Sequence, residues 1–397
     1  MKFNEWNKVK LGEVIQFNPP ETLKKGTIAK KVGMDKLAPY QKKINGYECQ
    51  EYKGGVKFRN GDTLFARITP SLENGKTAQV DILDKEEIGF GSTEFIVWRE
   101  KEGKTINDFI YYLSISPEIR DVAIKSMTGT SGRQRVQLDA LKNHTVILPP
   151  VEEQKAIADF LSSLDKKIEV NNQISAVLEK IAHTIFKHWF IDFEFPDEKG
   201  NPYRSSGGEF VLSESIKIPI GWKFRKLNEV VNIKYGKNLP TKNLLDNGFP
   251  VFGGNGKIGY FNEYLYEKPQ VLVACRGAAS GKVLTSLPYS FVTNNSLVLE
   301  YENGPLTFEY LKYYCLQNPF FQYVTGSAQP QITITNISNA PILIPNKTVL
   351  LKYSQIVKSI EEKILLIKKE NKYLSNIRDT LLPKLMSGEI RVPVESD

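Results

Sequence analysis

Two long stretches with a regular spacing of apolar residues constrain the fold of this chain more than any other feature. The first follows Pro149 and Pro150, and the second follows Pro345. In each, apolar residues alternate steps of three and four with one gap, which predicts a coiled-coil helix of about forty residues, roughly 60 Å long. The predicted stripes are Ile157, Leu161, Leu164, Ile168, Ile174, Leu178, Ile181 and Ile185, and Ile356, Ile360, Ile364, Ile367, Leu374, Ile377, Leu381 and Leu385. A helix with one apolar stripe needs a partner, and we expect the two helices to pair with each other.

The two halves of the chain repeat the same motifs in the same order. The segment WNKVKLGEV from Trp6 aligns with WKFRKLNEV from Trp222, and TGTSGRQRV aligns with TGSAQPQIT. Residues 58–80 and 266–286 both show an apolar strand followed by an Arg, a small-residue loop and a Lys. A repeat of this length predicts two similar α/β heads, each followed by one of the long helices.

Two heads and two long helices can be related by a pseudo-two-fold axis if the helices run antiparallel. Asn171 and Asn371 take the core position halfway along the two stripes, where paired amides fix the register at some cost in stability. The alternative is that each amide reaches water. The predicted fold class is therefore α/β (α+β) and multidomain, with two similar globular heads joined by an antiparallel coiled coil. Such a protein holds two heads at a fixed distance, which suits two half-sites on duplex DNA.

Composition narrows the class of partner and the compartment. The chain of 397 residues has 53 Lys and Arg against 45 Asp and Glu, a net charge of +8, which moderately favours a polyanionic partner over none. Its three cysteines are far apart, which argues against a disulfide framework or a cysteine-rich zinc site. The first residues form no apolar leader, and no run of eighteen apolar residues occurs, so we expect a cytoplasmic protein without a membrane partner.

Several longer motifs resemble one protein family over nearly the whole chain. They are GDTLFARITPSLENGK, TGTSGRQRV, ILPPVEEQKAIADFLSSLD, IFKHWFIDFEFPDEKGNPYRSSGGEF, IPIGWKFRKL and IRDTLLPKLMSGEI. Together they make the chain similar to the specificity (S) subunits of type I restriction-modification systems. The resemblance implies a non-catalytic subunit that binds a bipartite double-stranded DNA target and docks two methyltransferase subunits and motor/nuclease subunits. S-adenosylmethionine, Mg²⁺ and ATP are then expected in those partners, with no cofactor or metal in this chain.

The same resemblance implies a division of the chain into five parts. These are a first target-recognition domain at residues 1–149, a conserved helix at 150–195, a connector at 196–214, a second target-recognition domain at 215–345, and a second conserved helix with the C-terminal tail at 346–397. The sequence departs from the family pattern in two places. The second helix begins NKTVLLKYSQIVKSI where the first has VEEQKAIADFL, and the loop TGSAQPQIT lacks the arginines of TGTSGRQRV.

Three short motifs resemble enzyme sites, and each departs from its pattern. GNGKIG (residues 254–259) fits GxGxxG, but an aromatic run follows where a dinucleotide site needs a helix. GAASGKV (residues 277–283) resembles a phosphate-binding loop, but Val283 replaces Ser or Thr and the glycines are one residue too close. NPPE (residues 18–21) resembles the Asn-Pro-Pro-aromatic turn of amino-methyltransferases, but Glu21 replaces the stacking aromatic. We expect no catalytic residue in these motifs.

The glycine-rich loops of both heads are the predicted DNA-facing surface. Gly lets backbone N–H groups approach phosphate, flanking Arg and Lys supply charge, Asn and Gln suit adenine edges, and Arg suits guanine. For each residue a solvated loop side chain is an equally good interpretation. The candidates are Arg67, Thr69, Ser71, Asn74, Lys76, Thr128, Ser131, Arg133, Gln134 and Arg135 in the first head, and Asn255, Lys257, Arg276, Ser280, Lys282, Thr325, Ser327, Gln329 and Gln331 in the second.

The stretch TIFKHWFIDFEF (residues 184–195) looks at first like a metal or acid/base centre. His183 and His188 are five residues apart, off a common helix face, so joint metal ligation is disfavoured. We expect its aromatics to anchor the end of the first long helix before a turn-rich connector. Two alternatives to a DNA-recognition subunit remain, namely a stand-alone nuclease or methyltransferase and a coiled-coil scaffold without a DNA role.

Overall fold

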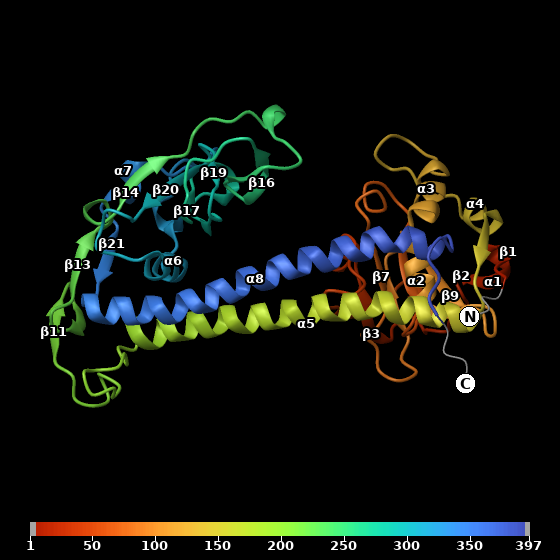
Figure 1. The fold of residues 1–397 in the computed structure, drawn as a ribbon, viewed down its shortest axis with the longest axis horizontal. Coiled ribbons are helices and arrows are strands. Elements are labelled where there is room, and N and C mark those ends of the chain that lie inside the picture. Colours follow the sequence, from red (N-terminus) through yellow and green to blue (C-terminus); the bar gives the residue numbers. More distant parts are fainter. Residues whose placement is uncertain (1–4, 394–397) are drawn as a thin grey trace. The chain divides into compact units, whose positions relative to one another are not determined.

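The structure is a computed structural model that describes residues 5–393. The chain divides into two compact units, each with its own core (Figure 1). Unit 1 comprises Met1–Asn172 and Lys368–Asp397, and unit 2 comprises Gln173–Ile367. The two long helices therefore each contribute one half to unit 1 and the other half to unit 2.

Unit 1 is built on two four-stranded sheets. The first has the order β2-β9-β6-β7 with every neighbouring pair antiparallel, and the second has the order β4-β3-β8-β5 with one parallel pair, β3 and β8. The strands are β1 (Asn7–Lys10), β2 (Ile15–Phe17), β3 (Ile28–Val32), β4 (Glu48–Glu51), β5 (Val56–Phe58), β6 (Thr63–Ala66), β7 (Thr77–Gln79), β8 (Gly89–Gly91), β9 (Phe95–Glu100) and β10 (Thr145–Leu148). The helices are α1 (Leu11–Val14), α2 (Asn107–Ile115), α3 (Pro117–Lys125) and α4 (Leu138–Asn143), with a 3₁₀ turn η1 (Met34–Lys36).

Unit 2 repeats the order of the first of these sheets, with different loops. Its four-stranded sheet has the order β14-β20-β17-β18, and all its pairs are antiparallel, as in the first sheet of unit 1. The strands are β11 (Phe210–Ser213), β12 (Ile216–Pro219), β13 (Lys223–Lys226), β14 (Asn232–Tyr235), β15 (Phe249–Gly253), β16 (Gly256–Phe261), β17 (Val271–Ala274), β18 (Val283–Thr285), β19 (Phe291–Val292), β20 (Ser296–Glu300) and β21 (Pro341–Ile344). The helices and 3₁₀ turns are α6 (Phe308–Gln317), α7 (Ile334–Ser338), η2 (Leu227–Glu229), η3 (Thr241–Asn243), η4 (Gly277–Ala279) and η5 (Phe320–Tyr323).

The central strand pairs form because their residues suit burial on both faces. All four residues of β6 (TLFA) and all four of β17 (VLVA) are buried, and each strand lies between two neighbours. Continuous apolar runs of this kind are typical of strands covered on both sides. The second sheet differs between the units, since unit 2 has the three-stranded order β16-β15-β19 where unit 1 has four strands. The predicted fold class, with two similar mixed α/β heads and two long helices, is confirmed.

The long helices α5 (Val151–Phe190) and α8 (Lys347–Met386) each have 40 residues. Within unit 1 they run antiparallel, because Asp165 contacts Arg378 and Asn171, farther along α5, contacts Asn371, which comes earlier in α8. Pro383 lies inside the last turns of α8. No helix among residues 5–393 is both long and apolar enough to span a bilayer.

Helix α5 ends at Phe190, and residues 191–195 leave the helix in a turn. Phe193 has a φ of 60°, which turns the chain out of the helix. Phe190, Phe193 and Phe195 all pack against Trp222, with ring centroids 5.8, 5.7 and 5.0 Å away. In a continued helix, Phe193 and Phe195 would point about 200° apart, so only a broken helix buries both. The tertiary packing of unit 2 therefore sets the helix end.

The buried seam of the long helices differs in part from the predicted stripe. Ile157 and Leu161 are fully buried as expected, but Ile174 and Ile181 are 41% and 42% exposed. Ser175 and Ala182 lie buried in their place. In the second helix, Ile356 and Ile377 are also exposed, at 43% and 46%. The stripe prediction was wrong at these four positions, because a straight helix drifts away from a strict seven-residue repeat. In unit 2 the aromatic core also selects the face of α5 that is covered, since Ala182 and Phe186 belong to that core.

Candidate nucleic-acid interface

Three backbone segments meet beyond the end of β6 in unit 1. The N–H of Arg67 donates to the carbonyl of Glu94 at 2.9 Å, and the N–H of Val136 donates to the carbonyl of Arg67 at 2.9 Å. The N–H of Thr69 donates to the carbonyl of Gln134 at 3.0 Å. Residues 67–69, Glu94 and residues 128–136 therefore form one site, which we call the loop junction of unit 1.

The same junction recurs in unit 2 with the same hydrogen bonds. The N–H of Cys275 donates to the carbonyl of Asn295 at 2.9 Å, and the N–H of Ile332 donates to the carbonyl of Cys275 at 3.0 Å. The N–H of Gly277 donates to the carbonyl of Pro330 at 2.9 Å. The loop junction of unit 2 therefore comprises residues 275–277, Asn295 and residues 325–332.

This register fixes which residues of the two junctions are equivalent. Arg67 corresponds to Cys275, Glu94 to Asn295 and Arg135 to Gln331. Strand pairing agrees, because Ala66 lies opposite Phe95 in unit 1 and Ala274 lies opposite Ser296 in unit 2. The sequence comparison had matched Arg67 with Arg276, so it was shifted by one residue at this point.

Arg135 is held by backbone and side-chain contacts together. Its N–H and carbonyl pair with the backbone of Thr128 at 2.9 and 3.0 Å. Its guanidinium donates from Nη2 to Glu94 Oε1 at 2.6 Å and from Nε to Glu94 Oε2 at 2.9 Å. The hydrogen bonds from Arg135 hold the pKa of Glu94 below its ordinary value, although partial burial opposes the shift. Arg135 keeps 45% of its side chain exposed, so the guanidinium is fixed and accessible at once.

The other predicted residues of the first head lie in different environments. The exposed ones are Asn74, Thr128, Ser131, Arg133 and Arg135, and the half-buried ones are Arg67, Thr69, Ser71, Lys76 and Gln134. Lys76 donates from Nζ to the carbonyl of Met34 at 2.9 Å, which directs its ammonium toward the protein. Thr69 Oγ1 accepts from the N–H of Gln134 at 3.1 Å. Arg133 and Arg135, the two predicted guanine-reading side chains, are both exposed.

The predicted residues of the second head are also divided by their environment. The exposed ones are Asn255, Lys257, Arg276, Lys282, Thr325, Ser327, Gln329 and Gln331. Ser280 is buried, and its hydroxyl donates to the carbonyl of Pro330 at 3.0 Å, so it braces the junction. Lys257 lies 4.3 Å from the ring centroid of Tyr260. The junction thus brings together Arg276, Thr325, Gln329 and Gln331, while Asn255 and Lys257 lie on the separate β15–β16 hairpin.

Two of the three enzyme-like motifs do not form the local structure that their enzyme sites have. GNGKIG runs into strand β16, whereas a dinucleotide site has a helix there. GAASGKV contains only the short 3₁₀ turn η4 and then strand β18. Neither motif therefore places a helix N-terminus beside its glycines, which is the feature that binds phosphate in both site types.

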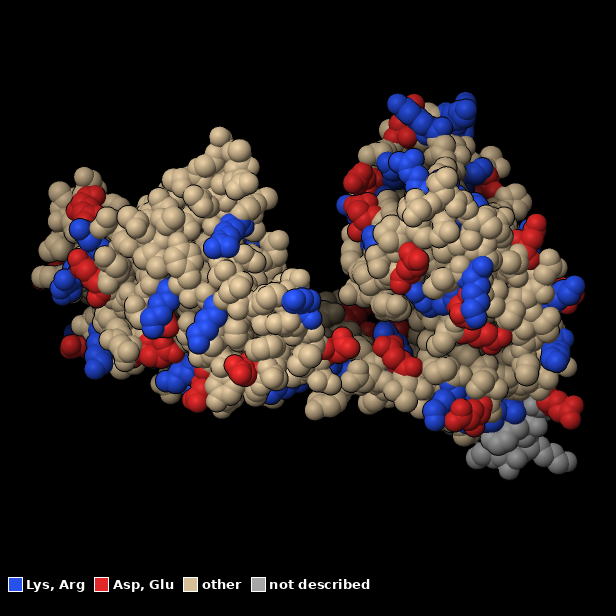
Figure 2. Space-filling model, turned by 90° about the horizontal axis from the view of Figure 1, so that it is seen from above, with Lys and Arg blue, Asp and Glu red and all other residues tan. Residues whose placement is uncertain are grey.

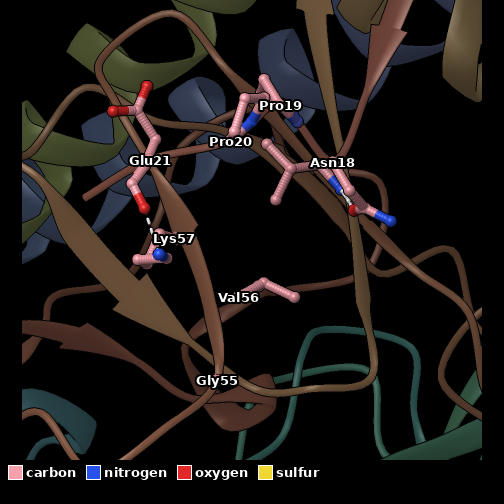
Figure 3. A pocket seen from close by; sticks show the side chains of 8 residues that line it. Asn18, Pro19, Pro20, Glu21, Gly55, Val56 and Lys57 are labelled. Atoms are coloured by element: carbon pink, nitrogen blue, oxygen red, sulfur yellow. Dashed lines mark hydrogen bonds between the residues drawn. The ribbon is translucent and has the colours of Figure 1, made fainter. Parts of the chain in front are cut away.

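NPPE lines a cavity of about 260 Å³ (Figure 3). The side-chain oxygen of Asn18 accepts from the N–H of Val97 at 2.9 Å, and the ammonium of Lys57 donates to the carbonyl of Glu21. The carboxylate of Glu21 accepts from both Arg59 and Arg99 at 2.6 Å. Burial raises the pKa of Glu21, but these two hydrogen bonds outweigh it and leave the pKa below its ordinary value. The turn is therefore used to tie strands together.

The aromatic stretch at the end of α5 is also structural. Among residues 5–393 no group of three or more His, Cys, Asp or Glu side chains is placed to hold a metal. Glu194 accepts from the N–H of Ser205 at 3.0 Å and from its hydroxyl, which fixes the connector after α5. The ring of His183 lies against Tyr313, with centroids 6.2 Å apart.

Surface charge is mixed rather than concentrated. Figure 2 shows Lys and Arg side chains interspersed with Asp and Glu on the visible face of unit 1 and of unit 2. A mixed surface gives modest long-range attraction to a polyanion.

Comparison with known proteins identifies the family. A family model described as the type I restriction modification DNA specificity domain matches residues 4–180 and 219–376. The chain belongs to this family. The two matched segments of the specificity domain each span one repeat, including most of the long helix that follows it.

Individual relatives carry the same description. The chain is 28% identical to the type I restriction enzyme MjaIX specificity subunit of Methanocaldococcus jannaschii, over 74% of this chain and 71% of that protein. It is 25% identical to the HindI specificity subunit of Haemophilus influenzae, over 84% of this chain and 87% of that protein. The crystal structure of an S subunit from M. genitalium has the same fold, with a TM-score of 0.56 at 19% identity over 97% of this chain and 96% of that chain.

Sequence reasoning missed two residues of the specificity-domain junctions. Glu94 and Asn295 were not among the candidates, although each directly precedes the central strand of its sheet, β9 or β20. An alignment of TEFIVW with NNSLVL at these strands would have paired them. The sequence indicated these two residues only weakly, because neither lies in a glycine-rich loop.

Proposed function

We propose that this chain is the DNA-recognition subunit of a type I restriction-modification complex and that it is not itself catalytic. In this proposal each loop junction reads one half of a bipartite duplex target. The observation that carries the proposal is the recurrence of one junction in two units with different side chains. Arg135 in unit 1 is replaced by Gln331 in unit 2, and Arg and Gln suit different bases. The same backbone arrangement can therefore carry side chains that recognise two different half-sites.

The proposal assigns the chemistry to partner subunits. Two methyltransferase subunits would supply S-adenosylmethionine chemistry, and motor/nuclease subunits would supply Mg²⁺ and ATP chemistry in the cytoplasm. The family membership and the names of the relatives support this assignment. The local structures of GNGKIG and GAASGKV also support it, because neither has a helix N-terminus beside its glycines, and so do the ion pairs that Glu21 of NPPE forms with Arg59 and Arg99.

The deciding experiment is co-expression with the cognate methyltransferase subunit in a host that lacks other DNA methylation, followed by sequencing of the methylome. We expect a bipartite motif with a fixed unspecified gap, absent when either protein is omitted. Random methylation, or the same motif without this chain, would overturn the proposal. The purified chain alone should neither methylate nor cleave DNA and should not hydrolyse ATP.

A further inference from the structure

The two loop junctions differ in charge at the equivalent positions Glu94 and Asn295, and Arg135 and Gln331. In unit 1 the pair is Glu94 and Arg135, which form a bidentate ion pair at 2.6 and 2.9 Å. In unit 2 the same backbone sites hold Asn295 and Gln331, two neutral amides that are both exposed. The backbone hydrogen bonds of Glu94 and Arg135 recur at Asn295 and Gln331, so the two pairs can be compared by their side-chain chemistry.

The geometry of the pair determines which edge of Arg135 remains available. A guanidinium has two planar forks of N–H donors, one formed by Nε with one Nη and one formed by the two Nη atoms. Glu94 engages the first fork through Nε and Nη2. The second fork, between Nη1 and Nη2, is then directed away from the carboxylate. Two parallel N–H donors in a fixed plane match the O6 and N7 acceptors of guanine.

We propose that Glu94 is a positioning residue that orients Arg135 for reading guanine in one half-site, and that Asn295 and Gln331 form the corresponding base-selecting pair of unit 2. This inference rests on the proposed function. Glu94 does not touch DNA in this scheme. It holds the plane of the guanidinium before DNA arrives and cancels its charge, so the pair contributes selectivity more than general attraction to phosphate.

A purely structural role does not explain the pair. Arg135 is 45% exposed and Glu94 is 23% exposed, and solvent-exposed ion pairs add little to folding stability. The backbone pairing of Arg135 with Thr128 already fixes the loop without the carboxylate. Removing the carboxylate should therefore leave the fold intact and release only the guanidinium.

The test uses the full chain co-expressed with its methyltransferase subunit and reads the methylome motif. We expect Glu94→Gln to retain both halves of the motif but to lower the preference for guanine at one position of one half by about tenfold. Arg135→Ala should relax that same position, and Glu94→Asp should largely retain it. Glu87→Gln, which removes a carboxylate paired with Lys30 at 2.8 Å in the same unit, is the matched control and should leave the motif unchanged.

The second part of the test places the side chains of the unit 2 pair at the equivalent positions of unit 1. The double variant Glu94→Asn with Arg135→Gln should replace guanine by adenine at the position that Arg135→Ala relaxes. Thermal unfolding of each variant should stay close to wild type. If Glu94→Gln and Arg135→Ala change no position, or affect both halves equally, the inference fails while the proposed function stands. If the wild-type complex yields no bipartite motif, the proposed function itself fails.

Discussion

The side-chain amide of Asn171 donates to the side-chain oxygen of Asn371 at 2.8 Å, across the two antiparallel helices of unit 1. Asn171 also donates to Glu370 at 2.8 Å, and Asn371 donates in turn to Asn172 at 2.8 Å. Asn171 is only 1% exposed, so its amide depends on these partners. A polar pair at this depth is satisfied in one register of the helices, since sliding either helix by a turn would place an amide against an apolar side chain.

The first prediction concerns this pair. Asn171→Ile should lower the free energy of unfolding by about 1–3 kcal/mol, because it leaves the Asn371 amide facing an apolar side chain. The double variant with Asn371→Ile should recover part of the loss. Chemical denaturation measures the free energy of unfolding of both variants. Asn376→Ala, at an exposed position, is the control. A double variant less stable than either single variant would contradict the prediction.

The second prediction concerns the buried ion pair between Arg378 and Asp165. Arg378 donates to Asp165 Oδ1 at 2.7 Å, and their side chains are 7% and 12% exposed. Arg378→Met should lower the free energy of unfolding by about 3–5 kcal/mol, because it leaves a buried carboxylate without its cation. Lys155→Met removes the exposed pair between Lys155 and Asp159 within α5 and should change the free energy of unfolding by less than about 0.5 kcal/mol. Equal effects in urea denaturation would contradict this reasoning.

The third prediction concerns a tyrosine contact that both units share. Tyr112 donates to Asp165 in unit 1 and Tyr313 donates to Glu361 in unit 2, each at 2.6 Å, and both carboxylates occupy the same position along their long helix. Tyr313→Phe should cost about 1–2 kcal/mol. Burial and the Glu361 carboxylate raise the pKa of Tyr313, so its absorbance should titrate later than that of an exposed tyrosine. Tyr373→Phe, at a 70% exposed position, is the matched control.

The fourth prediction is a pH dependence at the unit 1 junction. The folded-state pKa of Glu94 lies below its ordinary value of 4.5, so its pairing with Arg135 stabilises the fold fully above that value. This contribution is lost as the pH falls through the folded-state pKa, because the carboxyl must then be protonated. The small difference in unfolding temperature between wild type and Glu94→Gln should therefore shrink from about pH 7 to about pH 3. If the difference in unfolding temperature instead grew toward low pH, the prediction would be refuted.

The fifth prediction concerns the independence of the two heads. Replacing residues 215–345 by the corresponding segment of another specificity subunit should change one half of the methylated motif and leave the other half and the gap unchanged. The reason is that the unit 2 junction lies wholly within this segment, while the unit 1 junction and both long helices lie outside it. Methylome sequencing of the chimera measures the result. A change in both halves would show that the heads do not read DNA separately.

The sequence alone was enough to predict the large-scale organisation of this protein. Its internal repeat predicted two similar heads, and its apolar spacing predicted two long helices, because these features depend on local periodicity and on motifs that recur in order. The sequence also placed Asn171 and Asn371 at comparable positions along the two helices.

Only the tertiary structure decided three finer points. The seam excludes Ile174 and Ile181 and buries Ser175 and Ala182 instead, because packing between elements selects which side chains of a helix are covered. The pairing of Glu94 with Arg135 and the equivalence of Arg67 with Cys275 arise from strands brought together across long sequence separations. No local pattern encodes such contacts, since they exist only once the sheets have formed and the loops meet at their ends.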